Sequence, residues 1–198
     1  MNPLLTIRGT IALGVALSGL IMAIYSDGHT SRTEWFVWMH VMAGITWIGL
    51  LYYFNFVQVP GVARALAEAG DGGPGAAAIN KYIAPTALLW FRMAAVVTWL
   101  TGATMLWTYG ELDDAFLLRG DAVPIGVGAW LGTIMLFNVW VLIWPNQKKI
   151  LGLTATPASA DEIAKAKKVA LMASRTNTAL SIPMLLAMTA WSHGGFPF

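Results

Sequence analysis

The sequence predicts an all-α integral membrane protein in which five transmembrane helices form one helical bundle. Only 11% of the 198 residues are charged, 57% are hydrophobic and the mean hydropathy is +0.63, whereas a soluble domain is about one-quarter charged. The apolar residues also gather into five runs of about twenty residues. At 1.5 Å rise per residue, that length crosses a hydrocarbon core of about 30 Å.

The five spans are expected near residues 4–25, 34–58, 83–109, 124–145 and 168–192, with polar stretches between them. Since none of those stretches reads as a second domain, residues 1–198 are predicted to form a single membrane domain. The first run has Arg8 as a basic flank and in that respect is similar to a signal peptide. Because "MAIYSDG" offers no small-x-small cleavage site, we favour a retained span.

Basic residues predict how the bundle is oriented in the membrane. Arg32 and Arg119 fall on one side of the predicted bundle. The basic residues on the side of the N-terminus are more numerous: Arg8, Arg64, Lys81, Lys148, Lys149, Lys165, Lys167 and Lys168. We therefore expect a cytoplasmic N-terminus and a C-terminus outside, in the periplasm. The outer loops are acidic, which makes a basic partner such as a soluble cytochrome a candidate to dock there.

The stretch "WFVWMHVMAGITWIGLLYYFNFVQVP", residues 35–60, carries His40 inside an apolar run. Helix rise places His40 about 10 Å below the outer surface. Gly44 and Trp47 follow at three- and four-residue spacing, so they share its helix face. Imidazole is a usual axial donor to haem iron, and Gly44 leaves room for a macrocycle. The alternative for His40 is a neutral imidazole bonded to a backbone or hydroxyl group on another helix, and the alternative for Gly44 is room for a neighbouring helix.

Two arginines, Arg92 and Arg175, lie at membrane depth, and the interiors of the five spans contain no Asp or Glu. A charge at this depth costs at least a few kcal/mol and is normally paired or facing water. Haem propionates, an anionic substrate such as a purine, and lipid phosphates are candidate partners. For Arg175, snorkelling to the cytoplasmic face is an equal alternative. Asn55, Asn138 and Asn177 are candidates to complete a substrate or anion pocket.

The chain contains no cysteine, which excludes disulfides, thiolate metal sites, covalent c-type haem and iron–sulfur clusters held by its own thiols. Histidine is then the residue best suited to hold a metal. His193, in "WSHGGFPF", lies at the outer end of the last span and is either a second axial ligand or an ordinary interfacial histidine. His29, in a short outer loop, is expected to be exposed.

Four segments, in the same order, resemble the membrane domain of the PuuD-type urate oxidase (urate hydroxylase) family. They are "HVMAGITWIGLLYYF", "WFRMAAVVTWLTG", "NVWVLIWPNQKK" and "SRTNTALSIPMLLAMTAWSH", and they cover most of residues 35–193. The first is also similar to the histidine-containing helix of HemJ-type protoporphyrinogen oxidases and CopD-like proteins. In the HemJ type the matching histidine is a haem ligand, so the resemblance implies that His40 binds haem b. It also implies the bacterial inner membrane.

The chain departs from the family pattern at two points. Met93-Ala94-Ala95 stands where the family has an acidic residue after the aromatic-basic pair, and Thr176 stands where it usually has His. The family also carries a C-terminal cytochrome c domain. Since this chain has no Cys, we expect any electron acceptor to be another polypeptide.

These observations leave three hypotheses. We prefer a PuuD-like membrane subunit associated with electron transfer, which binds haem b and works with a separate cytochrome or a larger membrane complex. The first alternative is a non-catalytic accessory subunit that binds lipid and another membrane protein. The second is a urate-hydroxylase-like oxidoreductase, which the missing acid and histidine disfavour. None of the three involves nucleic acid.

Overall fold

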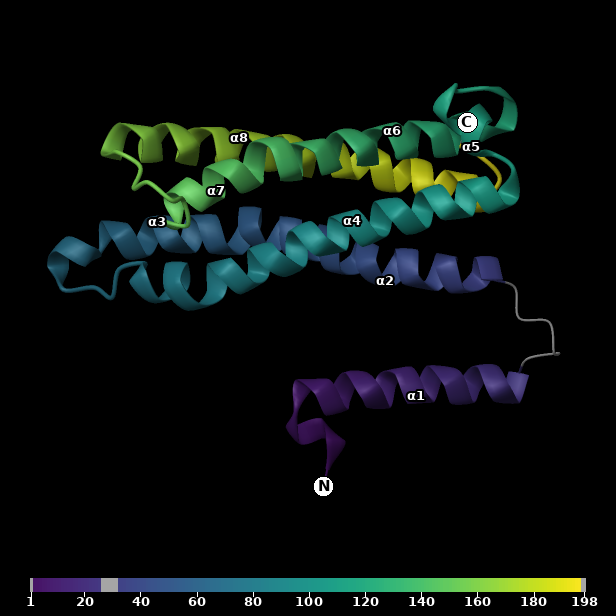
Figure 1. Cartoon of the computed structure of the whole chain (residues 1–198), viewed down its shortest axis with the longest axis horizontal. Coiled ribbons are helices and arrows are strands. Elements are labelled where there is room, and N and C mark those ends of the chain that lie inside the picture. The colour runs from purple at the N-terminus through teal and green to yellow at the C-terminus, as the bar shows by residue number, and fades with distance from the viewer. Residues whose placement is uncertain (1, 26–31, 197–198) are drawn as a thin grey trace. The chain divides into compact units, whose positions relative to one another are not determined.

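The computed structural model describes residues 2–25 and 32–196, and every regular element in them is a helix (Figure 1). These residues belong to two compact units, Met1–Trp35 and Phe36–Phe198. In the first unit, the 3₁₀ turn η1 (Pro3–Leu5) precedes α1 (Ile7–Tyr25). No residue of α1 is buried, and its apolar side chains are exposed on all sides. Such a helix needs lipid or another protein surface around it.

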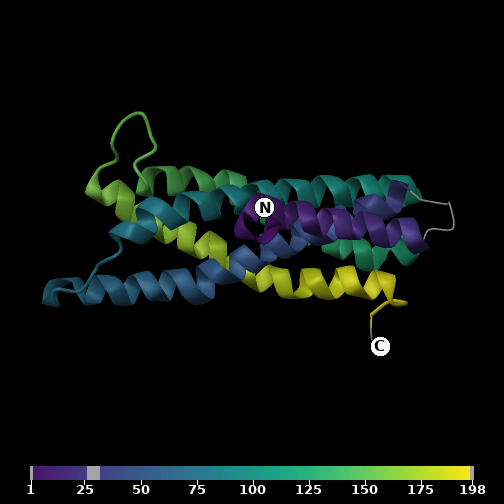
Figure 2. The same cartoon turned by 90° about the horizontal axis from the view of Figure 1, so that it is seen from below.

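Four long helical runs make up most of the second unit, which begins within the first of them, at Phe36. They are α2 (Arg32–Tyr52) with η2 (Tyr53–Gln58) and α3 (Val59–Ala67); η4 (Ile79–Ile83) with α4 (Ala84–Tyr109); α6 (Val123–Phe137) with η6 (Asn138–Ile143) and α7 (Trp144–Ile150); and α8 (Ala160–Ser192). Short elements lie between them: η3 (Ala69–Asp71), α5 (Leu112–Phe116) and η5 (Gly120–Ala122). The connections after α3 and α7 lie at one end of the bundle, and α5 and the end of α8 lie at the other (Figures 1 and 2).

Among the described residues, four helices are long and apolar enough to cross a membrane: Ile7–Tyr25, Arg32–Ala67, Ile79–Tyr109 and Gly120–Ile150. They correspond to the first four expected spans. The fifth, 168–192, lies within α8, which is long but is not among the helices apolar enough to cross a membrane. Arg175, Asn177 and several hydroxyl residues make α8 more polar than the other runs. A fifth span and the orientation in the membrane therefore stay predictions.

Three of the runs contain a π-helical segment that ends two residues before a proline. η2 precedes Pro60, η4 precedes Pro85 and η6 precedes Pro145. Proline has no N–H, and its ring clashes with the carbonyl four residues earlier. Here the residue before each proline bonds five residues back, as Trp144 does to the Val139 carbonyl. The wider turn accommodates the proline without ending the helix.

The π turns carry the helices past the expected bounds of the spans, and those bounds stay predictions. The second run continues to Ala67, beyond the expected residue 58. The fourth likewise continues to Ile150, and the third begins at Ile79 rather than at 83. The helices therefore extend further at the end of the bundle that carries the connections after α3 and α7 (Figure 2).

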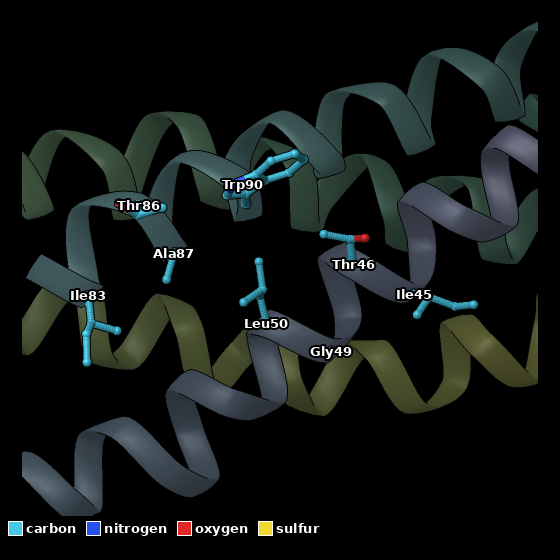
Figure 3. A pocket seen from close by; sticks show the side chains of 8 residues that line it. All are labelled: Ile45, Thr46, Gly49, Leu50, Ile83, Thr86, Ala87 and Trp90. Atoms are coloured by element: carbon cyan, nitrogen blue, oxygen red, sulfur yellow. The ribbon is translucent and has the colours of Figure 1, made fainter. Parts of the chain in front are cut away.

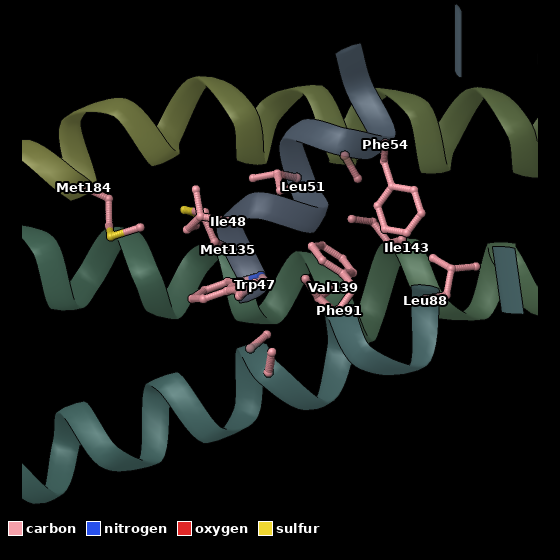
Figure 4. Close-up of a cluster of buried hydrophobic side chains, with 13 residues drawn as sticks. Trp47, Ile48, Leu51, Phe54, Leu88, Phe91, Met135, Val139, Ile143 and Met184 are labelled. Carbon is pink, nitrogen blue, oxygen red and sulfur yellow. The ribbon is translucent and has the colours of Figure 1, made fainter. Parts of the chain in front are cut away.

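The centre of the bundle is a cluster of buried apolar side chains to which all four runs contribute (Figure 4). Trp47, Leu51, Phe91 and Met135 are each exposed by 2% or less. The rings of Phe54 and Phe91 meet edge to face, with centroids 5.5 Å apart and an interplanar angle of 88°, a favourable arrangement for aromatic pairs. This cluster fixes α2 against α4, α6 and α8.

Small residues let α6 and α8 approach closely. A Cβ on Gly128 would lie 3.4 Å from the Cβ of Ala187 and 3.1 Å from Cε of Met188. On α8, Ala170 and Ala173 are buried as well. Close backbone approach at small residues is a common way for helices to associate in membranes, where burial from water contributes little.

Candidate functional site

His40 is held by α4. Its Nδ1 lies 2.8 Å from the carbonyl oxygen of Thr98 and 3.4 Å from Oγ1 of Thr101. Because a carbonyl only accepts, Nδ1 carries the proton and donates it to Thr98. In the neutral ring, Nε2 then keeps its lone pair, and no described residue bonds to it. Histidines that bind metals are commonly oriented in this way, with the other ring nitrogen donating to a backbone carbonyl.

The imidazole lies directly against Gly102. A Cβ at this position would lie 2.9 Å from Cε1 and 3.1 Å from Nδ1 of His40. One turn after His40 on α2, a Cβ on Gly44 would lie 3.8 Å from Cγ2 of Thr98, which is an ordinary van der Waals contact. Gly44 therefore faces a neighbouring helix, as one of the two sequence interpretations expected. Sequence reasoning missed Thr98, Thr101 and Gly102, although "TWLTG" places all three on one stretch of α4.

Trp47 is 2% exposed and belongs to the central cluster, and its indole Nε1 has no hydrogen-bond partner. It packs among apolar side chains one turn beyond Gly44 (Figure 4). Its role as a cofactor contact stays a prediction.

Arg92 has an aromatic partner that the sequence did not reveal. Its guanidinium carbon lies 3.8 Å from the centre of the Trp144 ring, and Nζ of Lys148 lies 5.9 Å from the same centre. Such contacts stabilise a cation by roughly 0.5 to 2 kcal/mol. One Arg92 nitrogen, Nη1, is buried without a hydrogen-bond partner. Arg175 is exposed on α8. Anion binding by either arginine stays a prediction.

The three predicted pocket amides are not gathered in one place. Nδ2 of Asn138 donates to Oδ1 of Asn177 at 2.8 Å, and Nδ2 of Asn177 donates to the carbonyl of Met135 at 2.9 Å. Both amides are buried and join α8 to the start of the π turn η6. Asn55 instead donates to Oγ of Ser174, at 2.8 Å. Asn138 and Asn177 are thus hydrogen-bonded to each other. Their binding of an anion stays a prediction.

His193 lies at the C-terminal end of α8 and is exposed. Its Nδ1 is 2.8 Å from the carbonyl of Thr189 and 3.0 Å from Oγ of Ser192, so both recorded partners belong to its own helix. His29 lies outside the described residues. Within 2–25 and 32–196, no group of three or more His, Asp or Glu side chains is placed to hold a metal ion.

An apolar groove of about 510 Å³ separates part of α2 from α4 (Figure 3). Leu50 of α2 and Trp90 of α4 line the groove from its two sides. The small residues Gly49 and Ala87 line it as well. Thr46, with its hydroxyl bonded to the carbonyl of Met42, adds little polarity. The groove offers no charged group and suits the acyl chain of a lipid.

A second cavity, of about 310 Å³, lies where the first three runs pass their π turns and α8 begins. We call it the glutamine cavity. Its walls are mostly apolar and include Phe54 and Phe91. Its polar lining residues are Gln58, Asn80, Gln147, Lys167 and Ser174. Sequence reasoning missed this site. The available signal was the two glutamines beside the prolines in "VQVP" and "WPNQ".

Residues 114–196 match the family model described as urate oxidase N-terminal. The matched stretch runs from α5 through α8 and contains Asn138, Arg175, Asn177 and His193. It confirms a urate oxidase N-terminal likeness for two of the four segments that suggested it. No curated protein and no solved structure matches the chain. The PuuD-type likeness of residues 35–109, and the HemJ-type and CopD-like similarity of the His40 helix, stay predictions.

Proposed function

We propose that this chain is a redox subunit of the bacterial inner membrane, related through residues 114–196 to the urate oxidase N-terminal family, and that it binds haem b through Nε2 of His40. The hydrogen bond from Nδ1 of His40 to the Thr98 carbonyl carries the proposal. It orients the ring and leaves Nε2 free to donate to iron. Haem, when bound there, supplies one-electron chemistry, while the protein supplies ligation and burial.

The surroundings of His40 fit an axial ligand in donor type and protonation state. Because Gly102 has no side chain, the imidazole can lie directly against α4. Oγ1 of Thr101 offers a second contact to Nδ1. Four helices apolar enough to cross a membrane support the location. The proposed electron partner is a separate cytochrome or a larger membrane complex. The acidic segment around Asp113 and Asp114 is the surface proposed to meet a basic partner.

A reduced-minus-oxidised absorption spectrum of the purified protein tests this function. Haem b bands are expected, and His40→Ala is expected to remove them. Thr104→Ala is the matched control, because its hydroxyl bonds only to the Leu100 carbonyl of its own helix. His193→Ala tests the second axial position: a shift of the bands would assign it. Absence of haem bands from folded protein, or bands unchanged in His40→Ala, overturns the ligand assignment.

An accessory subunit is the second candidate, and the buried amides favour it. The amides of Asn138 and Asn177 are hydrogen-bonded to each other, and the guanidinium of Arg92 stacks on the Trp144 ring. Gly44 lies against Thr98 of α4. The two asparagines, Arg92, Trp144 and Gly44, all singled out in the sequence or paired with one that was, therefore have a packing role as well. Folded protein that lacks haem and co-purifies with another membrane complex would favour this candidate.

A urate-hydroxylase-like oxidoreductase is the third candidate, because the matched family is urate oxidase N-terminal. Its test is turnover of urate by the purified protein with an added electron acceptor. Met93-Ala94-Ala95 and Thr176 occupy the positions where the family resemblance implies an acid and a histidine, so no turnover is expected.

A further inference from the structure

The glutamine cavity has one buried oxygen atom without a partner in its lining and a second one beside it. Oε1 of Gln58 is buried and has no hydrogen-bond partner. Next to the cavity, Nδ2 of Asn55 donates to Ser174, which lines it, and Oδ1 of Asn55 is likewise buried without a partner. A buried acceptor left unpaired loses its hydrogen bonds to water without replacement, which is unfavourable. The cavity therefore favours an occupant that donates hydrogen bonds.

The walls restrict the occupant further. The edge-to-face pair Phe54 and Phe91 offers aromatic surface on which a flat ring can pack. On the α3 side, Val59 and Leu66 line the cavity and are 38% and 55% exposed, so an apolar tail can leave along this helix. A phosphate diester could accept from Lys167, but its oxygens donate no hydrogen bond and would leave the Gln58 oxygen unpaired.

We propose that the glutamine cavity binds the ring of a membrane quinol, with one hydroxyl donating to Oε1 of Gln58. The second ring oxygen lies within the same polar lining, where Gln147 and Asn80 offer amide donors. The site is separate from His40: it is lined mainly by η2, α3, the start of α4, α7 and the first part of α8, and it includes no residue of α2. The proposal does not rest on haem binding.

The test compares decylubiquinol with decylubiquinone, binding to the detergent-purified full chain under anaerobic conditions. The quinone ring lacks a hydroxyl and leaves the Gln58 oxygen unpaired, so the quinol is expected to bind roughly tenfold more tightly. Gln58→Met keeps the length of the side chain and removes the acceptor, and it should abolish the preference. Asn146→Leu is the control, since its side chain bonds to Leu142 of its own run and lies outside the cavity lining.

The wild-type comparison decides the proposal even where a variant fails to fold. Equal affinity for the two probes overturns it, and so does the absence of binding by either, which would leave the cavity to water. A preference for the quinol that persists in folded Gln58→Met overturns the assigned hydrogen bond. The expected result is a preference that Asn146→Leu retains and Gln58→Met loses.

Discussion

Asn138 and Asn177 show how two polar residues can stabilise contact between apolar helices. Replacing Asn177 by Leu leaves Nδ2 of Asn138 without its partner and removes one of the donors to the carbonyl of Met135. Such a loss costs about 1 to 3 kcal/mol in a protein interior, and nearer 1 kcal/mol between membrane helices. We expect Asn177→Leu to lower the free energy of unfolding in detergent by about 1 to 2 kcal/mol.

Asn146→Leu is a matched control for this prediction, because its amide bonds to Leu142 within one helical run. Unfolding curves of both variants, recorded by circular dichroism, provide the measurement. Equal losses in Asn177→Leu and Asn146→Leu would show that the bond between α6 and α8 contributes nothing of its own.

Gly102 is required for the position of His40. An alanine Cβ would lie 2.9 Å from Cε1 of His40, so the ring must move away from the Thr98 carbonyl. At Gly49, by contrast, nothing lies within 4 Å of the added Cβ. Alanine is favoured over glycine in a helix by roughly 1 kcal/mol. We therefore expect Gly49→Ala to be neutral or stabilising in thermal unfolding and Gly102→Ala to be destabilising. Identical melting shifts would contradict the contact.

The sequence predicted part of this residue-scale picture. His40 and Asn177 stand out because each is polar within an apolar run. Their partners do not stand out, since Thr98 is 58 residues away from His40 and Asn138 is 39 residues away from Asn177. Which helix faces which depends on packing that no single run specifies. An amide or imidazole that seems to need an external ligand can therefore be satisfied by another helix of the chain.

At the scale of elements, the N-terminus of α8 is fixed by a capping box. Oγ of Ser159 accepts from the Glu162 backbone N–H at 3.3 Å, and the Glu162 carboxylate accepts from the Ser159 N–H at 2.9 Å. The backbone and hydroxyl of Ser159 donate to the carboxylate and hold the pKa of Glu162 below its ordinary value. The charged carboxylate is the form that stabilises the start of the helix.

This capping box predicts a pH dependence. Because the pKa of Glu162 is lower in the folded state, the contribution is fully present above the ordinary carboxyl pKa and is lost as pH falls through the lowered one. Glu162→Gln should therefore melt below the wild type at neutral pH, and the difference should shrink in acid. Thermal unfolding across this pH range provides the measurement. A difference that does not change with pH would show that the charge is not what matters.

The elements also show where sequence reasoning reaches its limit. Long apolar helices follow from the length of the runs, because a bilayer leaves the backbone no other way to satisfy its hydrogen bonds. Their ends do not follow, since Pro60 and Pro145 indicate helix ends while the π turns η2 and η6 carry the helix past them. The same turns place Gln58 and Gln147 at the glutamine cavity. That cavity depends on local backbone geometry rather than on a residue pattern.

For the whole molecule, the antiparallel runs of the second unit make topology testable. The connection after α3 and the connection after α7 lie at one end of the bundle, and α5 lies at the other (Figures 1 and 2). The chain has no cysteine, so a thiol reagent can label it only at a cysteine that is introduced. Asp71, Ala155 and Asp113 are exposed and mark the three connections.

We expect Asp113→Cys to react with an impermeant thiol reagent added to intact cells, because the positive-inside rule puts that connection outside. Asp71→Cys and Ala155→Cys should react only after the membrane is permeabilised. Reaction of both in intact cells, with Asp113→Cys protected, would reverse the orientation while keeping the bundle. Opposite results for Asp71→Cys and Ala155→Cys would contradict the bundle itself, since the two antiparallel runs between them, one containing α4 and the other α6, must return the chain to the same side.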